Sequence, residues 1–185
     1  MNYIRYMKKS KARDKILETA SRLFYKQGYM ATGINQIIKE AGVAKTTLYE
    51  HFHSKEDMLI EYLTNMSTQT DTWLRTETEK FSEPKEKVMA LFDFLIMLSA
   101  QASYNGCSFL SVVSELPPDS GKVKQIIKGQ KDNVRALFAE ILKPIKKENL
   151  ADELYMLFDG ALITNKVHND PWPIQTAKNV AMKLL

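Results

Sequence analysis

The sequence contains one cysteine, Cys107, three histidines and no long uninterrupted apolar run. A single cysteine excludes an internal disulfide and is typical of a protein kept in a reducing cytoplasm. The longest apolar stretch, residues 88–104, is interrupted by Asp93 and three further polar residues, so we interpret it as a buried helix and not as a membrane span. The basic N-terminus is not followed by a continuous apolar segment, and we expect no signal peptide.

The sequence also lacks the residue constellations that common enzyme classes require. It has no glycine-rich phosphate loop, no Gly-x-Ser-x-Gly segment and no second cysteine. His51 and His53 are separated by one residue, but no cysteine or carboxylate completes a ligand set at a recognisable spacing. We therefore expect no enzyme activity, no metal and no cofactor. An enzyme with an accessory basic segment and a helical adaptor for other proteins are the competing interpretations.

The net charge of +4 is small, but it is distributed unevenly along the chain. Residues 1–56 hold 11 Lys and Arg against 5 Asp and Glu, whereas residues 57–185 hold 15 against 17. The first segment therefore carries +6 and the second −2. A basic segment attached to a slightly acidic body is typical of a nucleic-acid-binding module, although a basic tail that only aids solubility is the alternative.

Apolar residues recur at helical spacing along the chain, which predicts an all-α fold of about nine helices. The first helix is expected over residues 12–27. Ser54 and Asp57 resemble a capping box that starts a long helix without Gly or Pro, and this helix would be a stiff connector. Later boundaries are expected at Pro84, at Asn105-Gly106, at Pro117-Pro118 with Asp119 or Ser120 as the next cap, and at Pro144. The last two helices are expected over residues 150–167 and 174–185.

Residues 28–57 predict two short helices joined by a tight turn. Ile34, Ile37 and Ile38 place one apolar face on the first of them, and Gly42 supplies the left-handed residue that ends it. The second helix would bury Leu48 and leave basic and hydroxyl side chains outside. Such a surface suits the DNA major groove.

The pattern GxxxTxxxxIxxxAGVxxxTLYxHFxSKE, which begins at Gly28, resembles the DNA-binding head of the TetR family of bacterial repressors. The segments AGV, TLY, HF and SKE occur in order at the family's spacing, which makes the match specific. The resemblance implies a helix-turn-helix domain over residues 1–57 and a helical ligand-binding and dimerisation domain over residues 58–185. One departure is Ala44, which stands where the family often has Ser at the helix N-cap, a loss of roughly 1 kcal/mol.

The resemblance also assigns roles around the second helix. It implies that Lys45 and Thr46 meet base edges, and that phosphates are held by Thr47, Tyr49, His51 and Lys55. The residue types agree, because Lys donates to guanine and Lys and Tyr donate to phosphate oxygens. Candidates from the preceding segment are Thr32, Asn35 and Gln36. For Tyr49 the alternative is packing against the core of its own domain.

A set of Met, aromatic and acidic side chains in the body is the candidate ligand pocket, although most of these residues are expected to be core: Tyr62, Met66, Met89, Phe92, Asp93, Met97, Tyr104, Phe109, Phe138 and Met156. Asp93 is more simply explained as a solvent-exposed carboxylate, and Cys107 as a buried, inert thiol rather than a redox sensor.

Two apolar stripes on the last two helices are the candidate dimer interface: Leu154, Leu157, Phe158, Ala161 and Leu162, then Val180, Ala181 and Leu184. The complete hypothesis is a repressor that binds a palindromic DNA operator as a homodimer and is released by a small apolar or amphipathic molecule. It would be cytoplasmic and would not contact a membrane. The alternatives within DNA binding are a transcriptional activator and a ligand-independent DNA-binding protein.

Overall fold

The computed structural model describes residues 12–117 and 120–185, and within them it contains helices and no strand. The α-helices are α1 (Ala12–Gln27), α2 (Ile34–Ala41), α3 (Lys45–His51), α4 (Lys55–Thr78), α5 (Pro84–Ser99), α6 (Ser108–Glu115), α7 (Gly121–Leu142), α8 (Ala151–His168) and α9 (Trp172–Leu184). Two 3-10 helices, Lys143–Ile145 and Glu148–Leu150, separate α7 from α8. The predicted all-α class is therefore confirmed. Pro118, Asp119 and the basic residues before Ala12 lie outside the described residues.

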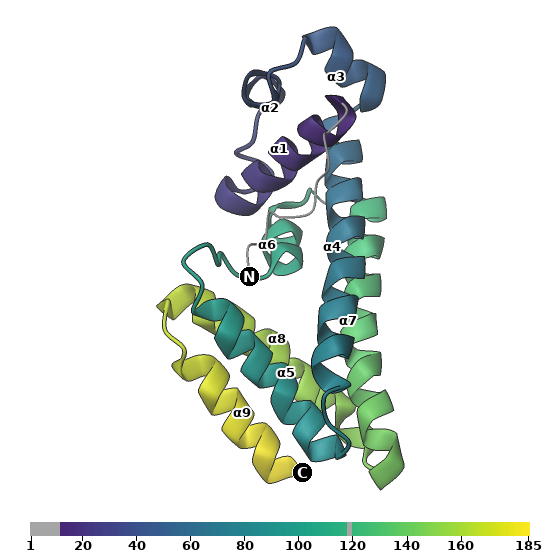
Figure 1. Cartoon of the computed structure of the whole chain (residues 1–185), viewed down its shortest axis with the longest axis vertical. Helices are drawn as coiled ribbons and strands as arrows, with labels where there is room; N and C mark the ends of the chain where they lie inside the picture. The colour runs from purple at the N-terminus through teal and green to yellow at the C-terminus, as the bar shows by residue number, and fades with distance from the viewer. Residues whose placement is uncertain (1–11, 118–119) are drawn as a thin grey trace.

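Helices α1 to α3 form a small head at one end of the molecule (Figure 1). Gly42 ends α2 in the left-handed conformation, with a φ of 65°, and its N–H donates to the carbonyl of Ile38, as predicted. Ala44 takes the N-cap position of α3 and supplies no capping hydrogen bond. The head is held together by apolar burial, because Ile16, Ile37 and Leu48 are fully buried.

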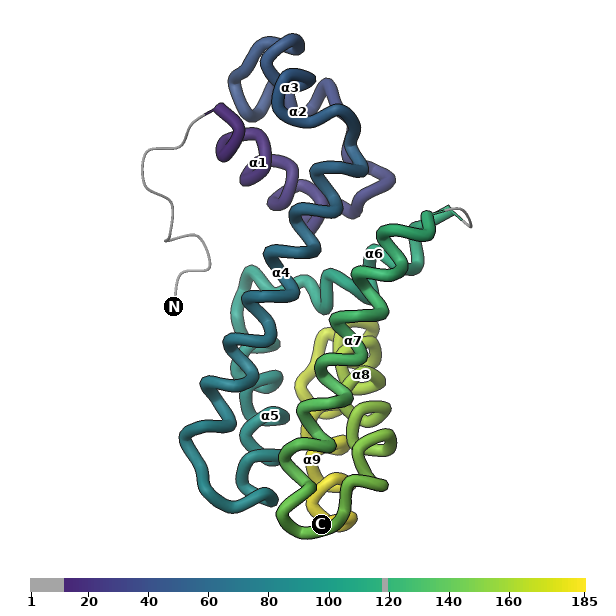
Figure 2. Tube along the Cα trace, turned by 90° about the vertical axis from the view of Figure 1, so that its right-hand side faces the viewer, coloured from purple at the N-terminus to yellow at the C-terminus, as the bar shows by residue number. Residues whose placement is uncertain are grey.

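The long helix α4 begins at the predicted capping box. The Ser54 hydroxyl accepts from the Asp57 N–H at 3.0 Å, and the Asp57 carboxylate accepts from the Ser54 N–H at 3.1 Å. From there α4 runs out of the head and along the full length of the body beside α7 (Figure 2). It contains no Gly or Pro, so the connection between the head and the body is helical throughout.

Two apolar cores lie along α4. The first, called the head core, joins the head to the start of α4, α6 and the start of α7: its buried members are Ile16, Ala20, Leu23, Phe24, Ile37, Leu48, Phe52, Met58, Leu59, Tyr62, Leu63, Phe109, Val112, Val123 and Ile127. The second, called the body core, gathers the later turns of α4 and α7 with α5, α8 and α9. Because the head core extends past residue 57 to Leu63 and to α6, a division of the chain at 57/58 stays a prediction.

Helix α5 is central to the body, as its almost continuous apolar surface predicted. It packs against α4, α7, α8 and α9 and buries Val88, Leu91 and Phe92 completely. It ends at Ser99, six residues before Asn105. Helix α9 starts at Trp172, two residues earlier than expected, because Pro173 fits within the first turn of a helix, where no N–H is needed.

Most of the predicted dimer stripe on α8 faces the interior of its own chain, so these residues are occupied there and their role in a dimer stays a prediction. The Phe158 ring packs against the rings of Phe92 and Phe138, each with centroids 5.8 Å away. The other buried members of the two stripes are Leu154, Ala161, Leu162 and Ala181, while Leu157 and Leu184 are half-buried against the body core. Only Val180 is exposed. Heptad-like spacing marked an apolar face correctly but could not say whether that face meets the same chain or a second copy.

In the described segments, no helix combines the length and the apolar character that a membrane crossing requires.

Replacing Phe158 with Ala should lower the free energy of unfolding by about 3–5 kcal/mol, because it removes one of three packed rings and leaves a cavity beside Phe92 and Phe138. The matched control is Phe81→Ala, the same change at an exposed ring, which should cost about 0.5 kcal/mol or less. Urea denaturation followed by circular dichroism measures both. Equal losses would show that Phe158 is not a core residue.

Candidate nucleic-acid interface

Helix α3 presents its polar side chains away from the head core. Leu48 is fully buried beneath the helix, whereas Lys45, Thr46, Tyr49 and His51 are exposed. Thr47 is half-buried. The helix therefore exposes an ammonium group, a hydroxyl, a phenol and an imidazole. Tyr49 is 41% exposed, which disfavours the alternative in which it packs into the core.

Helix α2 precedes this surface and contributes one free polar side chain at its start. Asn35 is exposed. Gln36, in contrast, is engaged within the head: its side chain exchanges hydrogen bonds with Gln27 and donates to Glu40 at 2.9 Å. Glu40 in turn pairs with Arg22 at 2.7 Å, and this hydrogen bond is the main cause of the lowered pKa of its carboxyl. These contacts tie α2 to α1 and fix the orientation of both helices beneath α3.

Two residues expected at DNA have other roles in this structure. Thr32 is 1% exposed, and its hydroxyl donates to the carbonyl of Gly28 at 2.7 Å. The Lys55 amine donates to the carbonyls of Tyr29 and Thr32, both at 2.9 Å, and lies 4.2 Å from the centre of the Tyr29 ring. Burial lowers the pKa of Lys55, and the charge of Glu115 opposes that shift. Thr32 and Lys55 therefore shape the turn between α1 and α2.

The ten candidate ligand residues do not line a single site. Tyr62, Met66 and Phe109 belong to the head core, whereas Met89, Phe92, Tyr104 and Phe138 belong to the body core. Met97 and Met156 are exposed at the surface. Asp93 is exposed as well and pairs with Lys178 at 2.5 Å, in agreement with the simpler explanation.

A layer of polar groups lies between the two cores, and spacing in the sequence did not reveal it. Cys107 contacts both cores, and its sulfur lies 3.5 Å from the amine of Lys131, which pairs with Asp159 at 2.8 Å. The Tyr155 hydroxyl donates to the same carboxylate at 2.8 Å. Cys107 is thus half-buried beside an ammonium group, rather than fully buried as expected.

Two buried polar atoms belong to the same region and have no hydrogen-bond partner there. They are the Tyr104 hydroxyl and the side-chain carbonyl oxygen of Gln130. Gln130 is 3% exposed and lies on α7 between Ile127 of the head core and Val134 of the body core. A buried polar atom without a partner costs about 1–3 kcal/mol unless water or a ligand satisfies it. Gln130 and Lys131 are functional candidates that only the fold brings to notice.

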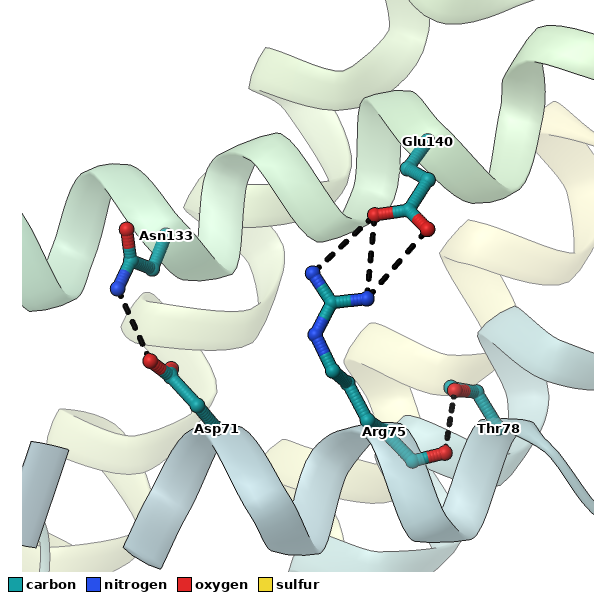
Figure 3. A network of polar contacts seen from close by, with 5 residues as sticks. All are labelled: Asp71, Arg75, Thr78, Asn133 and Glu140. Atoms are coloured by element: carbon teal, nitrogen blue, oxygen red, sulfur yellow. Dashed lines mark hydrogen bonds and ion pairs between the residues drawn. The ribbon is translucent and has the colours of Figure 1, made fainter. Parts of the chain in front are cut away.

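Two surface hollows lie further from the head, between α4 and α7. Their volumes are about 180 and 190 Å³, and both are lined by charged and polar side chains together with apolar ones such as Leu137. Figure 3 shows the contacts between α4 and α7 at these hollows: Asn133 donates to Asp71 at 2.9 Å, and Arg75 donates to Glu140 at 3.2 Å. Because these groups already satisfy one another and remain solvent-exposed, the hollows are poorly suited to an apolar ligand.

In sequence, the similarity to known proteins is concentrated in the head. The model of bacterial regulatory proteins of the tetR family matches residues 16–62. An uncharacterized HTH-type transcriptional regulator of Bacillus subtilis, YxaF, is 44% identical over 78 residues, which cover 42% of this chain and 41% of that protein. The HTH-type transcriptional activator FasR of Mycolicibacterium smegmatis is 34% identical over 87 residues, which cover 45% and 40%. The match thus spans less than half of these relatives' length.

In three dimensions, the similarity to a solved structure extends over almost the whole chain. SCO4454, a TetR-family transcriptional regulator from Streptomyces coelicolor, superposes with a TM-score of 0.87 at 25% identity, over 96% of this chain and 89% of that one. The likeness therefore includes the body as well as the head.

Replacing Lys55 and Lys45 by Ala, one at a time, should distinguish a lysine that stabilises the α1–α2 turn from one that lies exposed on α3. Lys55→Ala should lower the free energy of unfolding by about 1–3 kcal/mol, because the carbonyls of Tyr29 and Thr32 lose a charged donor. Lys45→Ala removes an exposed lysine from the same head and should change stability by about 0.5 kcal/mol or less. Urea denaturation compares the two. A loss at Lys45 as large as that at Lys55 would contradict these placements.

Proposed function

We propose that the chain is a DNA-binding transcriptional regulator of the TetR family and not an enzyme, because the model of that family matches its head over residues 16–62 and a TetR-family structure superposes on the chain. One observation carries the proposal: α3 is anchored in the head core by Leu48 and leaves Lys45, Thr46, Tyr49 and His51 exposed. A helix of this kind suits the major groove, where its first residues meet base edges. We place the protein in the cytoplasm, where it would reach its operator.

Within this proposal, Lys45 and Thr46 contact base edges, and Thr47, Tyr49 and His51 hold phosphates. Asn35 joins them from the start of α2. Exposure supports Lys45, Thr46, Tyr49, His51 and Asn35 as DNA contacts. Lys55 and Thr32 are instead assigned to the turn beneath the interface, since their polar groups are occupied by Tyr29, Thr32 and Gly28.

We further propose a homodimer formed through the outer face of α8 with help from α9. Met156, Gly160, Ile163 and Val167 follow one another at helical spacing, and all four are exposed, with Met156 at 71% and Val167 at 74%. A side chain added at Gly160 would meet no atom within 4 Å, so a second helix has room to approach it closely. An exposed apolar stripe of this kind is typical of a helix-to-helix interface.

The effector is proposed to act at the polar layer between the two cores. It would be a small amphipathic molecule whose polar groups hydrogen-bond with the Tyr104 hydroxyl and the Gln130 carbonyl, the two atoms left without partners. The location is suitable because α4 passes through both cores, so a molecule that separates them also moves the head. Release of DNA requires that the molecule bind the released state more tightly than the DNA-bound state.

The sign of regulation follows the family resemblance, and we propose a repressor. An activator is the second candidate, because the relative FasR bears that name. A regulator of either sign would use the same head, so the experiments below test DNA binding and dimerisation without assuming repression.

The proposed dimer should select an inverted repeat whose half-sites are about one helical turn apart, near 34–36 Å. Selection from random DNA with the wild-type protein, followed by footprinting, identifies the site. Lys45→Ala should then relax preference at one base pair of each half-site by roughly 1–3 kcal/mol. Tight binding of a single chain to one isolated half-site, or no selected sequence at all, would refute the proposal.

Replacing Ile163 with Glu should convert the dimer into a monomer, because two copies of the new carboxylate would be buried against apolar side chains. Sedimentation should give about 21.2 kDa for the variant and twice that mass for the wild type. Ile145→Glu is the matched control, since Ile145 is similarly exposed but lies on Lys143–Ile145, away from α8. A folded Ile163 variant that remains dimeric would place the interface elsewhere.

A further inference from the structure

The body reaches the head through a second route, besides α4. Helix α6 and the residues before it lie between α1 and the helices of the body (Figures 1 and 2). At the end of α6, the Glu115 carboxylate accepts a hydrogen bond from the Met30 N–H at 2.7 Å. Met30 is in the turn between α1 and α2, 85 positions away in the chain. This contact therefore joins the body directly to the turn that precedes α2.

The geometry of the turn matches this carboxylate closely. Gly28 has a φ of 94°, which disfavours any other residue, and a Cβ placed there would lie 2.8 Å from a carboxylate oxygen of Glu115. Lys55 holds the same turn through the carbonyls of Tyr29 and Thr32. The turn is thus bound by two charged side chains. The amine of Lys55, from α4, donates to backbone carbonyls, and the carboxylate of Glu115, from α6, accepts from a backbone N–H.

A second contact holds the end of α1. The Asn105 side chain, just before α6, donates to the carbonyl of Tyr25 at 2.6 Å, and its backbone N–H donates to the Tyr25 hydroxyl at 2.7 Å. The last carbonyls of a helix lack partners within the helix itself. Asn105 therefore caps α1 from the body, at the opposite end of the segment that carries Glu115.

From these contacts we infer that Asn105 and Glu115 are positioning residues, which fix the orientation of the head relative to the body and thereby the spacing of the two heads on DNA. This inference rests on the proposed function as a dimeric DNA-binding protein. In this inference, neither Asn105 nor Glu115 contacts DNA. They act through Tyr25 and Met30, which belong to the helix and the turn that lead to α2.

The start of α6 connects this grip to the proposed effector layer. Cys107 precedes α6 and lies 3.5 Å from the Lys131 amine, and Ser108 accepts a hydrogen bond from the Tyr62 hydroxyl at 2.7 Å. Burial raises the pKa of Tyr62, so its phenol remains a donor. A short helix that lies beside Lys131 at its start and binds the α1–α2 turn at its end can transmit a displacement from this layer to the head.

The test compares Glu115→Ala and Asn105→Ala with the wild type on two DNA duplexes. One carries the inverted repeat selected by the wild-type protein. The other has one base pair inserted at its centre, which increases the distance between the half-sites by about 3.4 Å and rotates one relative to the other by about a tenth of a turn. The ratio of the two dissociation constants measures how rigidly the heads are spaced. General loss of stability weakens binding to both duplexes and leaves this ratio unchanged.

We expect each Ala variant to reduce the ratio by about fivefold to tenfold, since a mobile head tolerates the longer site. Glu115→Gln should keep a ratio close to the wild type, because its amide oxygen still accepts from Met30. Two controls change contacts that lie outside the head: Ser114→Ala loses a hydroxyl that donates to the Ser111 carbonyl, and Asn133→Ala loses an amide that donates to Asp71. A ratio unchanged in both Ala variants, or reduced equally in the controls, would overturn the inference.

A measurement without DNA separates failure of this inference from failure of the proposed function. Hydrogen exchange of the Met30 amide should be about tenfold faster in Glu115→Ala than in the wild type, because the amide loses its acceptor. Unchanged exchange would overturn the inference even if DNA binding is specific. If the wild type selects no DNA sequence, the proposed function fails, while faster exchange would still support the grip on the turn.

Discussion

The first turns of α4 bury Met58, Leu59 and Leu63 in the head core, and its later turns bury Leu74 in the body core. One helix is therefore part of two separately packed apolar regions, and it has no Gly or Pro at which it could bend freely. Burial of these side chains stabilises both regions by about 25 cal/mol per Å² of apolar surface. We therefore expect a rearrangement of one core to act on the other through α4.

Polar contacts fix the orientation of segments that apolar packing only brings together. Apolar burial has no direction, whereas hydrogen bonds fix orientation. In the head, Lys55 holds the carbonyls of the α1–α2 turn, and Glu115 holds its Met30 N–H. Between the cores, Lys131 and Asp159 pair with side chains only 12% and 15% exposed. Removing one partner of such a pair is costly, because the other charge stays buried.

Short-range features of the chain were predictable because their causes are local. The span of α1, the left-handed Gly42 and the Ser54–Asp57 capping box all agree with the structure, since each depends on residues within one or two turns. The family resemblance of the head was predictable for the same reason. The ligand and dimer residues were less so: Phe92 and Phe138 proved to be packed core, and Phe158 faces them instead of a second copy.

The sequence by itself determined the helical class, the boundaries of most helices and the polar outer surface of α3, because periodicity and capping depend on neighbours in the chain. Tertiary structure alone decided which apolar face is interior and which is exposed, and it leaves Ile163 and Val167 on the exposed face of α8. It also decided that Lys55 serves the turn and that Glu115 meets Met30 across 85 positions. Such contacts have no periodic signature, because they arise only when distant segments pack together.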